Sequence, residues 1–399
     1  MRSGRLVAAD LAAAAIVVVG IAWVADLPRW LGQPIETERY LALALGLALA
    51  QAFLDTGATT AWRRGLETAL AIVVFGVCLW SALNFQRLSG DLPYLTPEIM
   101  ALSAVLLLGT GVAVWRQDGP SLVFFLLGVA AYAGIGDLLP TVIAPVPISV
   151  SRLVAYSAFD ANGLIGLPLR IAAETVLVFI LFGQTLTWSG GGQVLSGIAT
   201  LLMGRFRGGA AKVAVVASAL FGMISGSAVS NASTIGAVTI PTMRRAGFPA
   251  EVAAAVEATA STGGQIMPPV MGAAAFLMAE FLGVGYGDVV IAAIGPALLF
   301  YLSVFMQVDL AAVRYGMKAL GPEEIAKHRS PPRTWLLLLP AVVLCLGLFA
   351  MSWRLESAAV LATARRRSSF RRWPRVRGRC RSNCGACWWQ PAGRWARCW

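Results

Sequence analysis

The stretch from Gly222 to Pro241 reads G-M-I-S-G-S-A-V-S-N-A-S-T-I-G-A-V-T-I-P. It is crowded with Ser, Thr, Asn and Gly, and it holds few of the large apolar residues that lipid favours. A second stretch of the same kind, A-S-T-G-G-Q-I-M-P-P-V-M-G, follows at 260–272. The fold depends on what these two stretches do inside a chain that is otherwise strongly apolar.

Composition predicts a polytopic membrane protein. The 399 residues are 58% hydrophobic and only 13% charged, whereas about a quarter of the residues of an ordinary soluble domain are charged. Apolar segments lie at 6–25, 39–56, 66–85, 99–115, 121–143, 168–187, 211–222, 270–285, 288–308 and 335–352. The first segment resembles a signal peptide, but it is long and lacks a small-residue cleavage site, which favours a retained helix.

Basic residues indicate the orientation, because cytoplasmic loops are enriched in Lys and Arg. With the N-terminus in the cytoplasm, the inside loops hold Arg2, Arg5, Arg63, Arg64, Arg116, Arg205, Arg207 and Lys212. The outside loops then hold Arg29, Arg39, Arg87 and Arg152. We therefore expect a cytoplasmic N-terminus. Arg244 and Arg245 also lie inside if the first polar stretch is a re-entrant hairpin.

The second polar stretch predicts a discontinuous helix. Gly263-Gly264 ends the helix that begins near Pro249, and Pro268-Pro269 cannot continue it. A broken helix survives in a membrane only where protein or a water-filled cavity surrounds it. The carbonyl oxygens freed between Gly263 and Pro268 suit a small hard cation such as Na⁺.

The first polar stretch supplies matching side chains. Ser227 and Asn231 are four residues apart and share a face if the segment is helical. Further hydroxyls come from Ser225, Ser230, Ser233 and Thr234, and tight turns are permitted by Gly226 and Gly236. Helix N-termini at such a break favour an anionic substrate group. The alternative is helix packing, since Gly222-x-x-x-Gly226 is also a packing motif; two breaks so close together favour a site.

Glu257 lies in the helix that begins near Pro249, and intramembrane acids are generally functional. Two interpretations stay open: it handles a proton or a cation, or it lies at the membrane interface near a helix start. No His cluster and no nucleophile–base pair is evident in the sequence, so an enzyme is not expected.

The residues 224–248 (I-S-G-S-A-V-S-N-A-S-T-I-G-A-V-T-I-P-T-M-R-R-A-G-F) and 253–284 (A-A-A-V-E-A-T-A-S-T-G-G-Q-I-M-P-P-V-M-G-A-A-A-F-L-M-A-E-F-L-G-V) resemble the fused membrane permease of TRAP (tripartite ATP-independent periplasmic) transporters, of the TAXI branch. Shorter pieces at 162–169, 178–183 and 211–222 agree, and the resemblance covers about 144–320. Gln184-Thr185 departs from it, because the family more often has small and acidic residues there.

The resemblance implies secondary transport in a bacterial inner membrane. A periplasmic solute-binding protein would deliver an organic anion, often a carboxylate, and Na⁺ or H⁺ would drive uptake with no other cofactor. The expected cation site comprises Ser225, Gly226, Ser227, Asn231, Thr262, Gly263, Gly264 and Pro268. Ser230, Thr234, Gln265 and Pro269 are expected to face the substrate. A non-transporting membrane scaffold or anchor is the alternative.

The expected domains follow from the same comparison. They are a four-helix small-subunit-like module at 1–118, a connecting helix and loop at 119–167, a first repeat at 168–330 with a hairpin at 221–240 and a broken helix at 249–282, the start of a further transmembrane region at 331–356, and a tail at 357–399. The family's transport module has two inverted repeats, so we expect this chain to carry the first half only.

The tail is rich in Arg, Trp and Cys and has no globular pattern. Cys380, Cys384 and Cys387 have the spacing of an iron–sulfur motif, and with Cys398 they form a possible zinc set. A reading-frame slip in a GC-rich gene explains the composition better than either metal site.

Overall fold

The computed structural model describes residues 4–30, 32, 35–55, 60–135, 148–188 and 190–327. Every regular element in these ranges is a helix. Five helices among them are long and apolar enough to cross a membrane, at Val7–Val24, Ala61–Leu83, Pro97–Gln117, Leu167–Thr185 and Tyr286–Arg314. The all-α polytopic architecture expected from composition is confirmed. The apolar segment expected at 335–352 and the tail at 357–399 lie outside the described residues.

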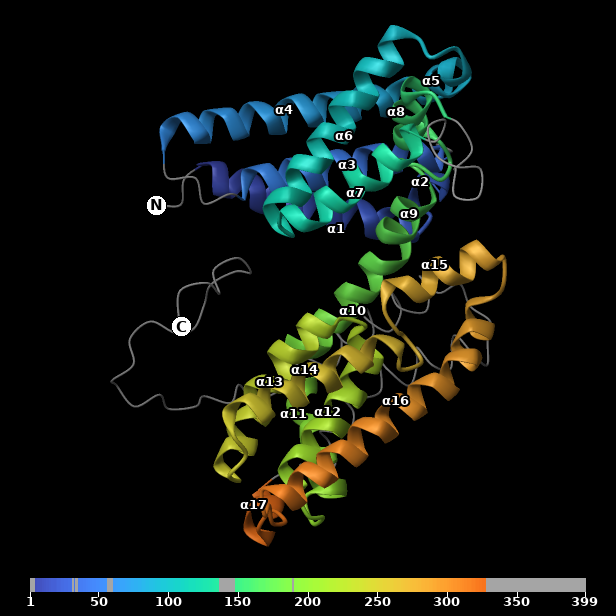
Figure 1. The fold of residues 1–399 in the computed structure, drawn as a ribbon. Helices are drawn as coiled ribbons and strands as arrows, with labels where there is room; N and C mark the ends of the chain where they lie inside the picture. The colour runs from blue at the N-terminus through green and yellow to red at the C-terminus, as the bar shows by residue number, and fades with distance from the viewer. Residues whose placement is uncertain are drawn as a thin grey trace.

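A first group of helices packs around its own core, drawn in blue to green in Figure 1. The group consists of α1 (Gly4–Val24), α2 (Leu27–Trp30), α3 (Thr37–Leu54), α4 (Ala61–Leu83), α5 (Phe85–Asp91), the 3₁₀ turn η1 (Leu92–Tyr94), α6 (Pro97–Gln117), α7 (Pro120–Gly134), α8 (Val150–Phe159) and α9 (Leu167–Arg170). Helix α3 is apolar on all sides, so it lies at the centre, with Leu41 and Phe53 buried.

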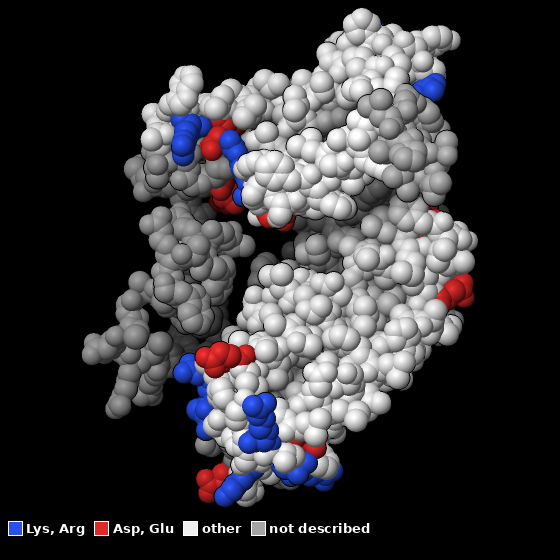
Figure 2. Space-filling model, in the orientation of Figure 1, with Lys and Arg blue, Asp and Glu red and all other residues white. Residues whose placement is uncertain are grey.

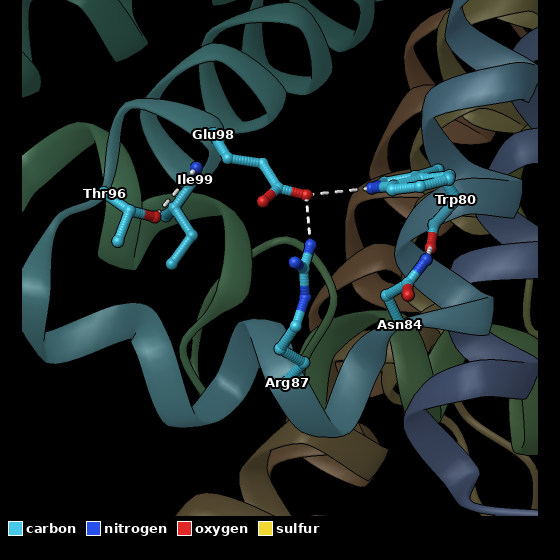
Figure 3. Close-up of polar contacts among 6 residues, drawn as sticks. All are labelled: Trp80, Asn84, Arg87, Thr96, Glu98 and Ile99. Carbon is cyan, nitrogen blue, oxygen red and sulfur yellow. Dashed lines mark hydrogen bonds and ion pairs between the residues drawn. The ribbon is translucent and has the colours of Figure 1, made fainter.

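Polar contacts hold the corner between α4 and α6 (Figure 3). The Glu98 carboxylate accepts a hydrogen bond from the Arg87 guanidinium at 2.5 Å and one from the Trp80 indole at 3.1 Å. The Thr96 hydroxyl accepts from the backbone N–H of Ile99 at 3.5 Å and caps α6. These bonds position the end of α4 against the start of α6.

Helix α8 lies in the region expected to connect the two modules by a helix and a loop. The Ser149 hydroxyl accepts from the backbone N–H of Arg152 at 3.4 Å, which starts the helix at Val150. The sequence analysis identified no helix here, because ten residues are too few to give a membrane-span signal. The preceding residues 136–147 are not among those described.

A second group of helices follows the π-helical turn η3 (Ile171–Val176) and is drawn in green to orange in Figure 1. It consists of α10 (Leu177–Trp188), α11 (Gly191–Met203), α12 (Gly209–Ser225), α13 (Ala228–Arg245), α14 (Ala250–Gly263), the 3₁₀ turn η4 (Gly264–Ile266), α15 (Ala273–Leu282), α16 (Tyr286–Arg314) and α17 (Pro322–Lys327). Helix α11 was not expected, because its Gly-rich start resembles a loop; packing of buried Leu195 and Ala199 against α12 overrides that local preference.

The two groups meet at η3. The Trp23 indole on α1 donates to the Glu174 carboxylate at 2.8 Å, and the Tyr40 hydroxyl on α3 donates to the carbonyl of Ala173 at 3.0 Å. The Trp23 and Tyr40 rings stack on each other with centroids 4.5 Å apart. A π-helical turn departs from the regular α-helical hydrogen-bond pattern of the backbone carbonyls. Within this turn, the Ala173 carbonyl accepts a hydrogen bond from the Tyr40 hydroxyl.

Charged side chains gather at the ends of the molecule and leave a broad uncharged band between them on the face shown in Figure 2. One such end holds α17 and the adjoining ends of α13 and α16. There Lys212, which is buried, pairs with Asp309 at 2.6 Å, and Arg207 pairs with the same carboxylate at 2.7 Å. The uncharged band has the character of a surface that faces lipid.

Candidate functional site

The first polar stretch contains a break between two helices. Helix α12 ends at Ser225, and Gly226 adopts a left-handed conformation with φ of 61°. A Cβ at Gly226 would lie 2.2 Å from the carbonyl oxygen of Met271, so only glycine fits. Helix α13 starts at Ala228, and the Ser227 hydroxyl accepts from the backbone N–H of Ser230 at 3.3 Å as its N-cap.

The helical hairpin is longer than the expected 221–240, because α12 and α13 together run from Gly209 to Arg245. The turn itself occupies Gly226 and Ser227 only. Gly236, expected to allow a tight turn, lies within α13 instead, where its Cα passes close to the Glu257 side chain.

The second polar stretch is also interrupted. Helix α14 ends at Gly263, η4 covers Gly264–Ile266, and helical structure resumes only at Ala273. The backbone N–H of Gly272 donates to the carbonyl of Gln265 at 2.7 Å, which closes the non-helical segment into a loop. The backbone N–H of Val270 donates to the carbonyl of Met223 at 3.2 Å, so this loop is bonded to the end of α12.

The two breaks meet at a backbone-to-backbone contact. A Cβ at Gly222 would lie 2.4 Å from the Cα of Gly264 and 3.0 Å from Nδ2 of Asn231. Asn231 is 0% exposed, and its Nδ2 donates to the carbonyl of Ser218 at 2.8 Å. In the described part of the chain, Oδ1 of Asn231 and the hydroxyl of buried Ser225 have no hydrogen-bond partner. Such buried acceptors cost about 1–3 kcal/mol each if they stay unpaired.

Glu257 lies in a pocket of hydroxyl groups and is 1% exposed. Its Oε1 accepts from the Ser218 hydroxyl at 2.8 Å and from the Ser261 hydroxyl at 3.0 Å. Its Oε2 accepts from the Thr239 hydroxyl at 2.5 Å. The donors come from α12, α14 and α13, so three helices converge on one carboxylate. Of the two interpretations of Glu257, this placement argues against an exposed interfacial residue.

Ser218 bonds to both Asn231 and Glu257. Its carbonyl accepts from the Asn231 amide, and its hydroxyl donates to Glu257. Ser218, Thr239 and Ser261 were all missed by the sequence analysis. The Glu257–Ser261 spacing of four residues was a usable signal, whereas Ser218 and Thr239 lie on other helices and gave none.

The expected site residues are partly brought together. Ser225, Gly226, Asn231, Gly263 and Gly264 lie at or beside the contact between the breaks. Thr262 is exposed, and its hydroxyl donates to the carbonyl of Ala258 on its own helix at 2.8 Å. Among the other expected residues, Gln265 is exposed, Pro269 is buried, and Ser227, Ser230, Thr234 and Pro268 are half-buried.

No group of three or more His, Cys, Asp or Glu side chains that could hold a metal ion occurs in the described ranges. The donors at the contact between the breaks are neutral oxygens, which are ligands of small hard cations rather than of transition metals. Interrupted helices of this kind, meeting within a polytopic helical membrane protein, are a feature of membrane transport proteins built on discontinuous helices.

Within that class, residues 99–365 match the family described as Tripartite ATP-independent periplasmic transporter, DctM component. The chain belongs to this family. Its members are transport permeases, not enzymes, which agrees with the expectation from the sequence.

Individual relatives agree with the family. The chain is 33% identical over 212 residues to the uncharacterized protein y4mL of Sinorhizobium fredii, covering 50% of this chain and 49% of that protein. It is 28% identical over 186 residues to the C4-dicarboxylate TRAP transporter large permease protein DctM of Pseudomonas aeruginosa, covering 46% and 43%. It is 26% identical over 245 residues to the isethionate TRAP transporter permease protein DctMQ of Oleidesulfovibrio alaskensis, covering 60% and 37%. Each match spans about half or less of the relative's length.

Proposed function

We propose that this chain is a membrane permease component of a secondary transporter that takes up organic anions delivered by a periplasmic solute-binding protein, driven by Na⁺ or H⁺. Membership of the DctM family supports the permease role. The relatives named for C4-dicarboxylate and isethionate support an organic anion as the transported solute. Two of the three relatives are named as TRAP transporter permeases, which favours this function over a non-transporting scaffold.

The observation that carries the proposal is the pair of unpartnered oxygens beside the contact of Gly222 with Gly264. Asn231 Oδ1 and Ser225 Oγ are buried and accept no hydrogen bond from the described residues. A cation bound at Asn231 Oδ1 would satisfy that oxygen, and Ser225 Oγ and backbone carbonyls between Gly263 and Pro268 are further neutral oxygen ligands at the two breaks. The cation site therefore consists of Ser225, Asn231 and this carbonyl segment.

The anionic substrate would lie beside the cation. Helices α13 and α15 both begin at the breaks, at Ala228 and Ala273, and a helix N-terminus favours a negative group. The exposed Gln265 and the half-buried Ser230 and Thr234 offer polar groups near these starts. A carboxylate next to a bound cation at the same crossing gives the mutual stabilisation on which symport depends.

The membrane in question is the inner membrane, with the N-terminus in the cytoplasm. Arg244 and Arg245 end α13, and Arg207 and Lys212 flank the start of α12, so one end of the hairpin is basic. Figure 2 draws the Lys and Arg side chains of this end in blue. The excess of Lys and Arg assigns that end to the cytoplasmic side.

Residues 1–118, which hold α1 to α6, correspond in this proposal to a small permease subunit fused to the large one, and the DctM match from residue 99 overlaps the last of these helices, α6. The helices that precede residue 99 lie outside the DctM match, which leaves room for a small-subunit module fused to the large one. The contacts of Trp23 and Tyr40 with η3 supply the joint between the two parts. The motifs at 224–284 favour the TAXI branch of the family.

The test uses the full chain in proteoliposomes. Thermal unfolding is followed while NaCl replaces choline chloride at constant ionic strength, and uptake of radiolabelled C4-dicarboxylates and isethionate is measured with purified binding protein added. The proposal predicts stabilisation by Na⁺ or by acid pH, and uptake that depends on the same ion. Absence of both effects, with binding protein still docking to the vesicles, would identify a scaffold instead.

A further inference from the structure

Glu257 is a buried carboxylate without a basic partner among the described residues. Its bonds go to the hydroxyls of Ser218, Thr239 and Ser261. The titratable group that faces it from α16 is Tyr301, whose hydroxyl donates to the carbonyl of Ala260 at 2.9 Å. A carboxylate in such a place must be neutralised by a proton or by a bound cation for much of its lifetime.

The other charged side chains on the helices around Glu257 either form ion pairs or lie at the helix ends. They are Lys212 on α12, Arg244 and Arg245 on α13, Glu251 on α14, and Asp288, Asp309 and Arg314 on α16. Lys212 is paired with Asp309, and Arg244, Arg245 and Glu251 are exposed. Neutralisation of Glu257 by a resident positive charge is therefore not available from these helices.

Thr239 lets Glu257 change its protonation state without losing a bond. Its hydroxyl oxygen lies 2.5 Å from Glu257 Oε2 and 3.0 Å from the carbonyl oxygen of Ile235. When Glu257 is ionised, Thr239 donates to Oε2. When Oε2 carries a proton, Glu257 donates to the Thr239 oxygen, and the Thr239 hydroxyl rotates to donate to Ile235. Oε1 keeps its bonds from Ser218 and Ser261 in both states.

Thr239 also lines a small cavity. It has a volume of about 20 Å³, and its lining combines the hydroxyl-bearing residues Ser196, Thr200, Thr239 and Thr242 with the apolar residues Ala210, Val213, Val238 and Leu320. This volume holds one water molecule, and the hydroxyl of buried Ser196 has no other partner in the described part of the chain. Beyond the cavity, the Thr242 hydroxyl accepts from the guanidinium of exposed Arg245 at 3.2 Å.

We propose that Glu257 is a reversible proton-binding site whose Oε2 exchanges its proton with bulk water at the Arg245 end of α13 through this cavity. The proton passes between Oε2 and bulk water by way of the Thr239 hydroxyl and one cavity water, so in the proposed uptake this route releases the proton on the cytoplasmic side. Ser218 then joins the proton site to Asn231, because one residue bonds to both. A role for this proton in driving uptake rests on the proposed function, whereas the titration of Glu257 stands without it.

Infrared difference spectroscopy on the full chain in lipid nanodiscs tests the proposal. Spectra are recorded between about pH 6 and pH 9, a range in which an ordinary exposed Glu stays almost fully ionised. We expect a reversible carbonyl band of a protonated carboxyl group. The band should disappear in Glu257→Gln and persist in Glu251→Gln, the matched change at an exposed acid on the same helix. A wild-type chain with no such band, or a band retained in Glu257→Gln, overturns the proposal.

Thr239→Val keeps the test decisive if Glu257→Gln does not fold. The ionised carboxylate loses a charge-assisted bond and the protonated form loses only a neutral one, so proton affinity should rise about tenfold. Thr239→Ser should restore the wild-type titration. An unchanged titration in Thr239→Val overturns the assigned role of Thr239. This measurement does not depend on cation binding or on uptake. A negative result therefore overturns the proton site and leaves the transport proposal to its own test.

Discussion

Gly222 on α12 and Gly264 in η4 touch through their backbones, and a Cβ on either one would lie within 2.7 Å of the other's Cα. This contact brings the two interrupted helices together and leaves Asn231 enclosed beside them. A methyl group at either position would separate the breaks, because the atoms it meets are backbone and cannot rotate away.

Gly222→Ala should therefore destabilise the protein by about 3 kcal/mol through overpacking. Thermal unfolding in detergent, followed by circular dichroism, measures the effect. Gly295→Ala on α16 is the matched control, because a Cβ there meets no atom within 4 Å and alanine favours a helix. Equal stability of the two variants would show that the contact between the breaks does not hold the site together.

Asn231→Ala should reduce cation affinity about tenfold, because it removes an oxygen that is free to bind the ion. The measurement is the NaCl dependence of the unfolding temperature, with choline chloride as the reference salt. Ser233→Ala on the same helix is the control, since its exposed hydroxyl donates to the carbonyl of Val229 at 2.7 Å. Undiminished Na⁺ stabilisation in Asn231→Ala would exclude this residue from the cation site.

Ser227→Ala should cost about 1 kcal/mol of stability through loss of the N-cap of α13. Because Asn and Asp cap helices as well as Ser does, Ser227→Asn should restore the unfolding temperature. The same titrations with NaCl separate capping from ion binding. If Ser227→Asn recovers stability but not Na⁺ affinity, then the hydroxyl is itself a ligand, as the sequence analysis expected.

Asp309→Asn should destabilise the protein, because the buried Lys212 ammonium then loses its carboxylate partner. Lys212→Met should cost less, since no buried charge then remains. A double-mutant cycle on unfolding free energies measures the coupling between the two residues. Arg207→Met serves as the control at the exposed member of the cluster; a cost there equal to that of Asp309→Asn would contradict the assignment.

Local chemistry explains what could be predicted about the breaks. Gly263-Gly264 and Pro268-Pro269 interrupt a helix whatever surrounds them, and the structure has a non-helical segment between η4 and α15 at this place. The extent of the first break was not predictable in the same way. Residues 228–236 contain Ser, Asn and Thr, which are weak helix formers, yet packing of α13 against α12 and α14 makes them helical.

The polar partners of Glu257 could not be predicted from spacing. Ser218 and Thr239 lie 39 and 18 residues away from it along the chain, on separate helices. Other Ser and Thr residues lie on the same or neighbouring helices, such as Ser230 and Thr242, but their hydroxyls do not bond to the Glu257 carboxylate. Which hydroxyl turns toward Glu257 is decided by the rotation of α12 and α13 about their axes, and that rotation is set by side-chain packing.

Residue chemistry alone therefore established an all-helical membrane protein with two interruptions, because lipid forces every backbone group into a helix unless Gly and Pro prevent it. The same reasoning placed an acid, Glu257, between these interruptions in the chain. Only the tertiary structure decided that the interruptions cross at Gly222 and Gly264 and that hydroxyls from three helices meet at Glu257. The reason is that close packing selects one relative rotation and offset of the helices, and those quantities depend on contacts between residues far apart in the sequence.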